Sequence, residues 1–127
     1  MKLAYVDTSC LVAIAFAEAG ATKVAGRLGR MDRLFASNLL EAELRSALAR
    51  EGLSADPAGL LSGITWVHPN RPLGGEFERV AAEGHVRGAD LWHLACALFL
   101  APEAKDLAFL TLDRRQEEIA RKLGFTA

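Results

Sequence analysis

The stretch Leu3-Ala4-Tyr5-Val6-Asp7-Thr8-Ser9 joins a short apolar run to an acid and two hydroxyl-bearing residues. Consecutive apolar residues that end at a charge are typical of a strand buried on both faces of a parallel sheet. Thr8 or Ser9 has the kind of side chain that caps a helix N-terminus, so a helix is expected to begin directly afterwards. The stretch therefore predicts a strand followed at once by a helix, with Asp7 at the junction.

The rest of the chain repeats this alternation of strands and helices. Further strands are predicted at 34–36, 64–67 and 107–111, and helices at 10–19, 21–30, 38–51, 57–63, 73–83, 91–100 and 114–123. Gly20 and Gly52 stand where the first and third of these helices are expected to end. Strands separated by helices imply right-handed crossovers and a parallel sheet with helices on both faces. We therefore expect a three-layer α/β fold with a mostly parallel sheet of four or five strands.

Length and composition indicate one globular domain, residues 1–127, with 51% hydrophobic and 24% charged residues. No apolar run approaches the roughly 18 residues of a membrane span, and the N-terminus does not resemble a signal peptide. A cytoplasmic protein without membrane contact is expected. Cys10 and Cys96 are isolated in the sequence and are predicted to be buried free thiols. The net charge of −1 argues neither for nor against nucleic acid as a partner.

Three more acids, Glu43, Asp90 and Asp113, occupy positions like that of Asp7, after a predicted strand or early in the next helix. The carboxyl ends of parallel strands line one crevice, where ligands bind. Carboxylates about 5 Å apart there repel by roughly 3 kcal/mol per pair at an effective dielectric of about 20. Mg²⁺, or Mn²⁺ in its place, is the usual partner of such an oxygen cluster. The sequence thus predicts a metal-dependent enzyme, in which neutralising Asp7, Glu43 or Asp90 leaves the metal-free protein at least as stable.

Each acid also has a purely structural interpretation. Asp90, directly before Leu91, is the clearest case of an acid that simply caps a helix. In the helix from 38, Glu41 lies three residues after Asn38, where a capping-box glutamate sits, and four before Arg45, at ion-pair spacing. Glu43 lies on the margin of the apolar stripe of that helix and has no such explanation. We therefore select Glu43 as the functional acid.

Five further residues are secondary candidates. Thr8 and Ser9 are helix caps first and possible ligands of metal-bound water second. Thr111, at the end of the last strand, either faces the crevice or merely suits an extended backbone. His93, placed on the outward side of its helix, is either a surface residue or one that orients a phosphate or a water. Arg114, directly after an acid, is a candidate for phosphate contact.

These motifs resemble those of PIN-domain ribonucleases, most closely the VapC-type toxins of bacterial and archaeal toxin–antitoxin pairs. The resemblance rests on four segments in order, 5–9, 37–44, 89–98 and 109–113, with Ala120 and Gly124-Phe125 behind the last. Trp92 departs from it, since a smaller residue is more usual there. A final edge strand after Phe125 is expected to be short or absent.

The resemblance implies a PIN-like fold and an endoribonuclease that hydrolyses RNA phosphodiester bonds to a 5′-phosphate and a 3′-hydroxyl. The four acids would hold one or two Mg²⁺ ions, one to activate a water and the other to stabilise the leaving oxygen. Single-stranded or looped RNA is the expected substrate, because unpaired strands fit a narrow cleft. A cognate antitoxin and a homodimer are the expected partners. The antitoxin is expected to insert a basic side chain among the acids, and the dimer to form through the apolar helix after Asp7.

Other classes fit the sequence less well. Phosphatases and phosphotransferases of the haloacid-dehalogenase type carry a second acid two residues after the first, where this chain has Ser9. A phosphoacceptor receiver domain needs adjacent acids after the first strand and a Lys after the last, but Lys105 precedes that strand. The remaining alternative is a PIN fold that binds RNA or protein without cutting.

Overall fold

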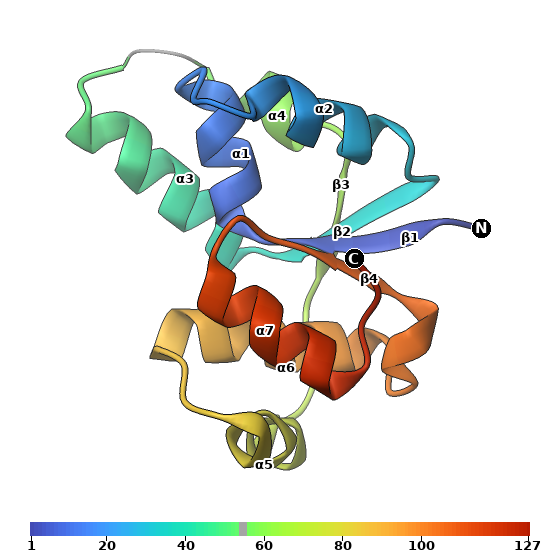
Figure 1. The fold of residues 1–127 in the computed structure, drawn as a ribbon. Coiled ribbons are helices and arrows are strands. Elements are labelled where there is room, and N and C mark those ends of the chain that lie inside the picture. The colour runs from blue at the N-terminus through green and yellow to red at the C-terminus, as the bar shows by residue number, and fades with distance from the viewer. Residues whose placement is uncertain (54–55) are drawn as a thin grey trace.

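Four parallel strands form the sheet of the protein, in the order β3-β2-β1-β4 (Figure 1). The computed structural model describes residues 1–53 and 56–127. The strands are β1 (Leu3–Val6), β2 (Arg33–Ser37), β3 (Ile64–Val67) and β4 (Ala108–Leu110). Tyr5 at the middle of the sheet pairs with Phe35 of β2 and with Phe109 of β4. The first strand of the sequence is therefore an interior strand of the sheet.

Helices cover both faces of this sheet (Figure 1). One face carries α1 (Thr8–Ala15), α2 (Ala21–Gly29), α3 (Leu39–Arg50) and α4 (Ala58–Leu61). The opposite face carries α5 (Gly74–Glu83), α6 (Gly88–Leu100) and α7 (Arg114–Leu123), and a short 3₁₀ turn, η1 (Ala104–Asp106), precedes β4. The predicted three-layer α/β fold is confirmed, with four strands that are all parallel.

The alternation of side chains along β1 explains why the strand is apolar throughout. Ala4 and Val6 point to the α1–α2 side, where they pack with Cys10 and Val24. Tyr5 points to the other side and packs in the core formed by α5, α6 and α7. Because helices cover both faces, Ala4, Tyr5 and Val6 are all buried and Leu3 is partly buried, and an unbroken apolar run results.

Most helix boundaries lie within two residues of the predicted ones, but two differ by three residues or more. Helix α1 ends at Ala15 rather than at residue 19, because Ala17 (φ 52°) has a left-handed backbone that a helix does not continue. Gly20 (φ 86°) accordingly begins α2 instead of ending α1. Helix α6 begins at Gly88, three residues earlier than predicted, so Asp90 lies in its first turn and does not cap it. An acid in the first turn is favoured there by the helix dipole.

The chain after α7 adds only one bridge to the sheet, between Ala108 and Thr126. The N–H of Phe109 donates to the carbonyl oxygen of Thr126 at 2.9 Å, and the N–H of Thr126 donates to that of Leu107 at 3.1 Å. This agrees with the expectation of a short or absent final strand.

Cys10 and Cys96 are both buried free thiols, as predicted. Burial raises the pKa of each to about 12. In the described part of the chain, no helix combines the length and the apolar character that a membrane crossing demands.

Candidate active site

The candidate site lies at the carboxyl ends of β1 and β4, two neighbouring strands. The chain leaves β1 toward α1 on one face of the sheet and leaves β4 toward α7 on the other (Figure 1). Such a divergence leaves a crevice at the strand ends, which is where open parallel sheets bind ligands. The N–H of Asp7 donates to the carbonyl oxygen of Leu110 at 2.9 Å and so joins the two strand ends.

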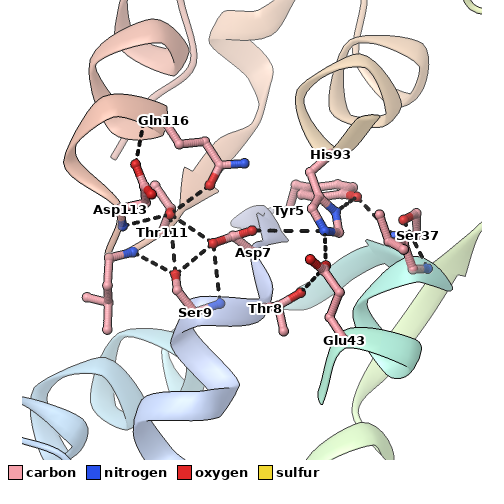
Figure 2. Close-up of polar contacts among 12 residues, drawn as sticks. Tyr5, Asp7, Thr8, Ser9, Ser37, Glu43, His93, Thr111, Asp113 and Gln116 are labelled. Carbon is pink, nitrogen blue, oxygen red and sulfur yellow. Dashed lines mark hydrogen bonds and ion pairs between the residues drawn. The ribbon is translucent and has the colours of Figure 1, made fainter. Parts of the chain in front are cut away.

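Asp7 is the centre of the first hydrogen-bond network (Figure 2). Its side chain is 5% exposed, and Oδ2 accepts from Ser9 Oγ at 2.7 Å, from Thr111 Oγ1 at 3.0 Å and from the Ser9 N–H at 3.3 Å. The other oxygen, Oδ1, lies 4.0 Å from His93 Nε2. Asp7 is thus the N-cap of α1 and at the same time presents one carboxylate oxygen away from its cap partners.

The start of α7 continues this network. Asp113 is the N-cap of the helix, because its Oδ1 accepts from the Gln116 N–H at 2.9 Å. The N–H of Asp113 donates to Thr111 Oγ1 at 3.1 Å, and Gln116 Oε1 lies 3.0 Å from the same hydroxyl. Gln116 is fully buried, and its Nε2 is the one buried side-chain atom without a hydrogen-bond partner in residues 1–53 and 56–127. The unpaired atom is an amide N–H donor, which a water can satisfy but a metal cation cannot.

Asp90 approaches Asp7 and Asp113 from α6. Burial raises the pKa of Asp90, and the charges of Asp7 and Asp113 raise it further. The charge of Arg87 lowers it, but not enough to restore its ordinary value. Asp90 is therefore within reach of the charges of Asp7 and Asp113, and a positive charge between these carboxylates would be favoured.

Glu43 belongs to a second network (Figure 2). Its Oε1 is hydrogen-bonded to Thr8 Oγ1 at 2.8 Å and to His93 Nε2 at 2.7 Å. Burial acts to raise the pKa of Glu43, but the hydrogen bonds from His93 and Thr8 outweigh burial, so the pKa is lowered. Protein donors therefore stabilise the Glu43 carboxylate, and the expectation that its removal leaves the metal-free protein at least as stable is not supported.

The secondary candidate residues have different surroundings in the structure. Thr8, Ser9 and Thr111 all have side chains in the two networks. The prediction that Thr8 or Ser9 caps α1 is wrong, because the Asp7 carboxylate takes that position. Arg114 is exposed at the first residue of α7.

His93 is not on the outward side of its helix, and that prediction is wrong. Its side chain has no exposed surface and lies between Tyr5 and Glu43. Helix α6 covers the sheet and is itself covered by α5, so residues 93–98 are all buried. An apolar helix of this kind has no solvent face to which a polar residue can be assigned.

The structural roles predicted for Glu41 are confirmed in part. Glu41 forms the expected ion pair with Arg45 at 2.7 Å, on the exposed side of α3. The predicted capping box is absent from the described hydrogen bonds, because Asn38 has helical dihedral angles and its side chain does not cap. Ser37 Oγ instead accepts from the Leu39 N–H at 3.3 Å.

Two residues of the site were missed in the sequence. Tyr5 lies inside the apolar run of β1, where only its hydroxyl distinguishes it from a core residue. Gln116 had a usable signal, because it stands three residues after Asp113, at the spacing of a capping box. Its side chain reaches Thr111 instead of returning to the helix start.

The carboxylate oxygens of the site suit a hard divalent cation, but these carboxylates do not form a compact group of ligands. In residues 1–53 and 56–127, no three His, Cys, Asp or Glu side chains are close enough together to hold one metal ion. The groups that would meet a cation are carboxylates, since Asp90 is within reach of the charges of Asp7 and Asp113. Mg²⁺ keeps several of its waters and binds proteins through one or two carboxylates, so these residues suit it. Whether the four predicted acids act together as ligands stays a prediction.

Comparison with known proteins assigns the family. Residues 4–122 match the model of the PIN domain. No protein of curated function and no solved structure matches the chain. PIN domains are generally nucleases that use divalent metals. Because the match covers most of the sequence and includes all four acids, the chain belongs to the PIN-domain family.

Proposed function

We propose that this protein is an Mg²⁺-dependent endoribonuclease, with Mn²⁺ as a substitute, and the toxin of a toxin–antitoxin pair. The observation that carries the nuclease assignment is the electrostatic coupling of Asp90 to Asp7 and Asp113 at the carboxyl ends of β1 and β4. Three carboxylates from three separate segments converge there without a basic side chain hydrogen-bonded to any of them among the described residues. Helix capping explains Asp7 and Asp113 one at a time, but it does not explain why a third carboxylate, Asp90, lies within reach of both charges.

Asp7, Asp90 and Asp113 would hold the cation, with Glu43 reaching it through water. When bound, the cation supplies charge stabilisation for the phosphodiester and an activated water at neutral pH. The protein itself holds the carboxylate oxygens in fixed positions. Ser9 and Thr111 hold one oxygen of Asp7, which leaves Oδ1 for the crevice.

RNA would approach along the start of α7. Arg114 is exposed next to Asp113, where its guanidinium can contact a backbone phosphate in bidentate fashion. Leu112, on the other side of Asp113, is 45% exposed and offers an apolar contact for a base. Both features favour an unpaired strand, whose bases are accessible.

We further propose a homodimer formed through the end of α1. Val12, Ile14 and Phe16 are only partly buried against the core. A shallow hollow of about 400 Å³ lies beside them, and Leu53 at its edge is 42% exposed. Apolar side chains around a hollow are typical of a surface that a second copy covers. The cognate antitoxin would then insert a basic side chain among the acids.

One observation favours the alternative, a PIN fold that binds RNA or protein without cutting. The described residues contain no compact metal-ligand group, and protein donors already engage Glu43. Such a protein would bind single-stranded RNA equally well with and without divalent metal.

The test is cleavage of single-stranded and hairpin RNAs by antitoxin-free protein, with Mg²⁺, with Mn²⁺ and with EDTA. We expect cleavage with either metal, none with EDTA, and none from Asp90→Asn protein, which excludes a contaminating nuclease. Intact RNA under all conditions, combined with metal-independent RNA binding, would favour the alternative. Light scattering tests the dimer, and a monomer at micromolar concentration would contradict it. A purified toxin–antitoxin complex that cuts as fast as free toxin would contradict the proposed mode of inhibition.

A further inference from the structure

His93 of α6 has both of its ring nitrogens in hydrogen bonds although it is completely buried. Nδ1 lies 2.8 Å from Tyr5 Oη, and Nε2 lies 2.7 Å from Glu43 Oε1 (Figure 2). Tyr5 comes from β1 and Glu43 from α3, so the imidazole joins three elements. Both nitrogens of the buried ring thus have the partners that a buried polar group requires, and the direction of each hydrogen bond can be assigned from its surroundings.

The direction of these hydrogen bonds follows from the groups around Tyr5. The Ser37 N–H, at the end of β2, donates to Tyr5 Oη at 3.1 Å. Burial raises the pKa of Tyr5 well above its ordinary value, so the hydroxyl keeps its hydrogen. That hydrogen has His93 Nδ1 as its acceptor. Nδ1 is therefore the unprotonated nitrogen, and Nε2 carries the ring hydrogen.

The opposite tautomer is unfavourable at both ends of the imidazole. With Nε2 unprotonated, two acceptors, Nε2 and Glu43 Oε1, would face each other at 2.7 Å. With hydrogen on Nδ1, the hydroxyl hydrogen of Tyr5 would lose its acceptor inside the core. The backbone of β2, through Tyr5, thus determines which nitrogen of His93 donates.

We propose that His93 is a positioning residue for Glu43, and that Ser37 and Tyr5 fix it in the tautomer that donates to the Glu43 carboxylate. The proposal rests on the nuclease function proposed above, because Glu43 is positioned there for a cation or its bound water. Thr8 and His93 both donate to Oε1, which prevents rotation of the carboxylate. Among the described residues Oε2 has no hydrogen-bond partner, so it is the oxygen left for a cation or its bound water. Partners of this kind usually change metal affinity or activity 10–100-fold when they are removed.

The tautomer can be measured on the metal-free protein, without reference to activity. Long-range ¹H–¹⁵N correlation spectra distinguish a ring hydrogen on Nε2 from one on Nδ1. His68 and His85 are exposed and serve as internal references. We expect His93 alone to be held as the Nε2–H tautomer at neutral pH. A His93 ring hydrogen on Nδ1, or rapid exchange between tautomers, would overturn the proposal.

Two matched substitutions test the positioning itself. His93→Gln places an amide nitrogen near the Nε2 position and retains a donor for Glu43. His93→Asn places its amide near the Nδ1 position, which retains a partner for Tyr5 but loses the donor. We expect His93→Asn to weaken Mn²⁺ binding, measured by calorimetry, by about 10–100-fold, and His93→Gln to restore most of that loss. Equal Mn²⁺ affinity of wild type and His93→Asn would overturn the proposal.

Tyr5→Phe provides a second route if neither His93 variant folds. It retains the aromatic ring that stacks on Phe109 and removes only the hydroxyl. We expect loss of the single tautomer together with weaker Mn²⁺ binding, and an unchanged spectrum would overturn the proposal. Wild-type protein that shows the Nε2–H tautomer but neither binds Mn²⁺ nor cuts RNA would contradict the nuclease function, and with it the metal-positioning role. The two failures are therefore distinguishable.

Discussion

The N–H of Asp7 donates to the carbonyl oxygen of Leu110 across 2.9 Å, although the two residues lie near opposite ends of the chain. This bond extends the pairing of β1 with β4 by one residue beyond the strands. It determines where the Asp7 carboxylate stands relative to Thr111, and Thr111 Oγ1 accordingly donates to Asp7 Oδ2 at 3.0 Å. The acids of the candidate site are therefore positioned by the sheet itself.

Asp90→Asn is expected to increase the stability of the metal-free protein at neutral pH. The folded-state pKa of Asp90 is raised above the ordinary value of 3.8, so its ionisation opposes folding as pH rises through that range. Removing the charge should add on the order of 1 kcal/mol to the free energy of unfolding at pH 7. The gain should disappear below about pH 4, where wild-type Asp90 is protonated. Urea unfolding in EDTA at both pH values measures this, and a less stable variant at pH 7 would contradict it.

Glu43→Gln is expected to have the opposite effect on stability. The pKa of Glu43 is lowered, so its carboxylate stabilises the fold above the ordinary value of 4.5, and this contribution is lost as pH falls through the folded-state pKa. We expect a loss of about 0.5–2 kcal/mol at pH 7, because the charge-assisted bonds from His93 and Thr8 are weakened. Chemical unfolding in EDTA gives the value.

Glu41→Gln is the matched control for that substitution on the same helix. Its ion pair with Arg45 is exposed, so the cost should be about 0.3–0.5 kcal/mol. RNA cleavage should be abolished by the Glu43 substitution and unchanged by the Glu41 substitution. Equal inactivation by both, in folded proteins, would show that Glu43 is the wrong choice of acid.

Mn²⁺ should stabilise the wild-type protein in proportion to its occupancy of the site. A ligand at 100 times its Kd adds about 2.7 kcal/mol to the free energy of unfolding. A thermal scan with increasing Mn²⁺ should therefore show a rising Tm that EDTA reverses. Asp90→Asn protein should show a much smaller rise, and an identical rise in both proteins would place the ion elsewhere.

Gly84→Ala should destabilise the connection between α5 and α6. A Cβ at this position would lie 2.7 Å from both Arg115 Nη2 and Ile119 Cδ1, and the backbone φ is 153°. Arg115 also donates from Nε to the His85 carbonyl oxygen at 3.1 Å, so its displacement disturbs the loop. We expect a loss of about 1–3 kcal/mol. Gly75→Ala in α5, where a Cβ meets nothing within 4 Å, should instead gain about 0.5–1 kcal/mol.

Cys10 and Cys96 should react with thiol reagents only when the protein unfolds. Both are buried, and burial raises the pKa of each to about 12, so the reactive thiolate is scarce at pH 8. Titration with a chromogenic disulfide should show two thiols in denaturant and very slow reaction in buffer. Rapid modification of either thiol in the native protein would contradict this.

Local patterns were sufficient for the strands and for the acids, because each depends on neighbours in sequence. The run from Leu3 to Val6 predicts a buried strand, and an acid directly after it must lie at the carboxyl edge of the sheet. The helical geometry of α3 likewise separates Glu41 from Glu43, since one falls on the exposed side and the other toward Thr8. The helical period, and the position of an acid directly after a strand, are enough to predict where these residues lie.

The surroundings of His93 could not be predicted in this way. Helix α6 is apolar on every side, so its sequence contains no stripe from which the direction of a single polar residue can be read. The partners of His93 lie 88 and 50 residues away along the chain. The contact of Gln116 with Thr111 spans only five residues, but it depends on how the chain turns from β4 into α7. Such contacts follow from tertiary packing.

The order β3-β2-β1-β4 also bears on how the protein is made. During synthesis β1 and β2 emerge early and can pair, but the edge of β1 that receives β4 stays open until Leu110 has been added. Asp7 lacks its hydroxyl partner Thr111 for the same period, and Asp113 does not yet exist. A nascent chain therefore carries an unpaired strand edge and an incomplete acidic cluster until β4 and Asp113 have been translated. The catalytic site proposed here cannot form before Asp113 has been added, which delays any cutting of RNA until that point of synthesis.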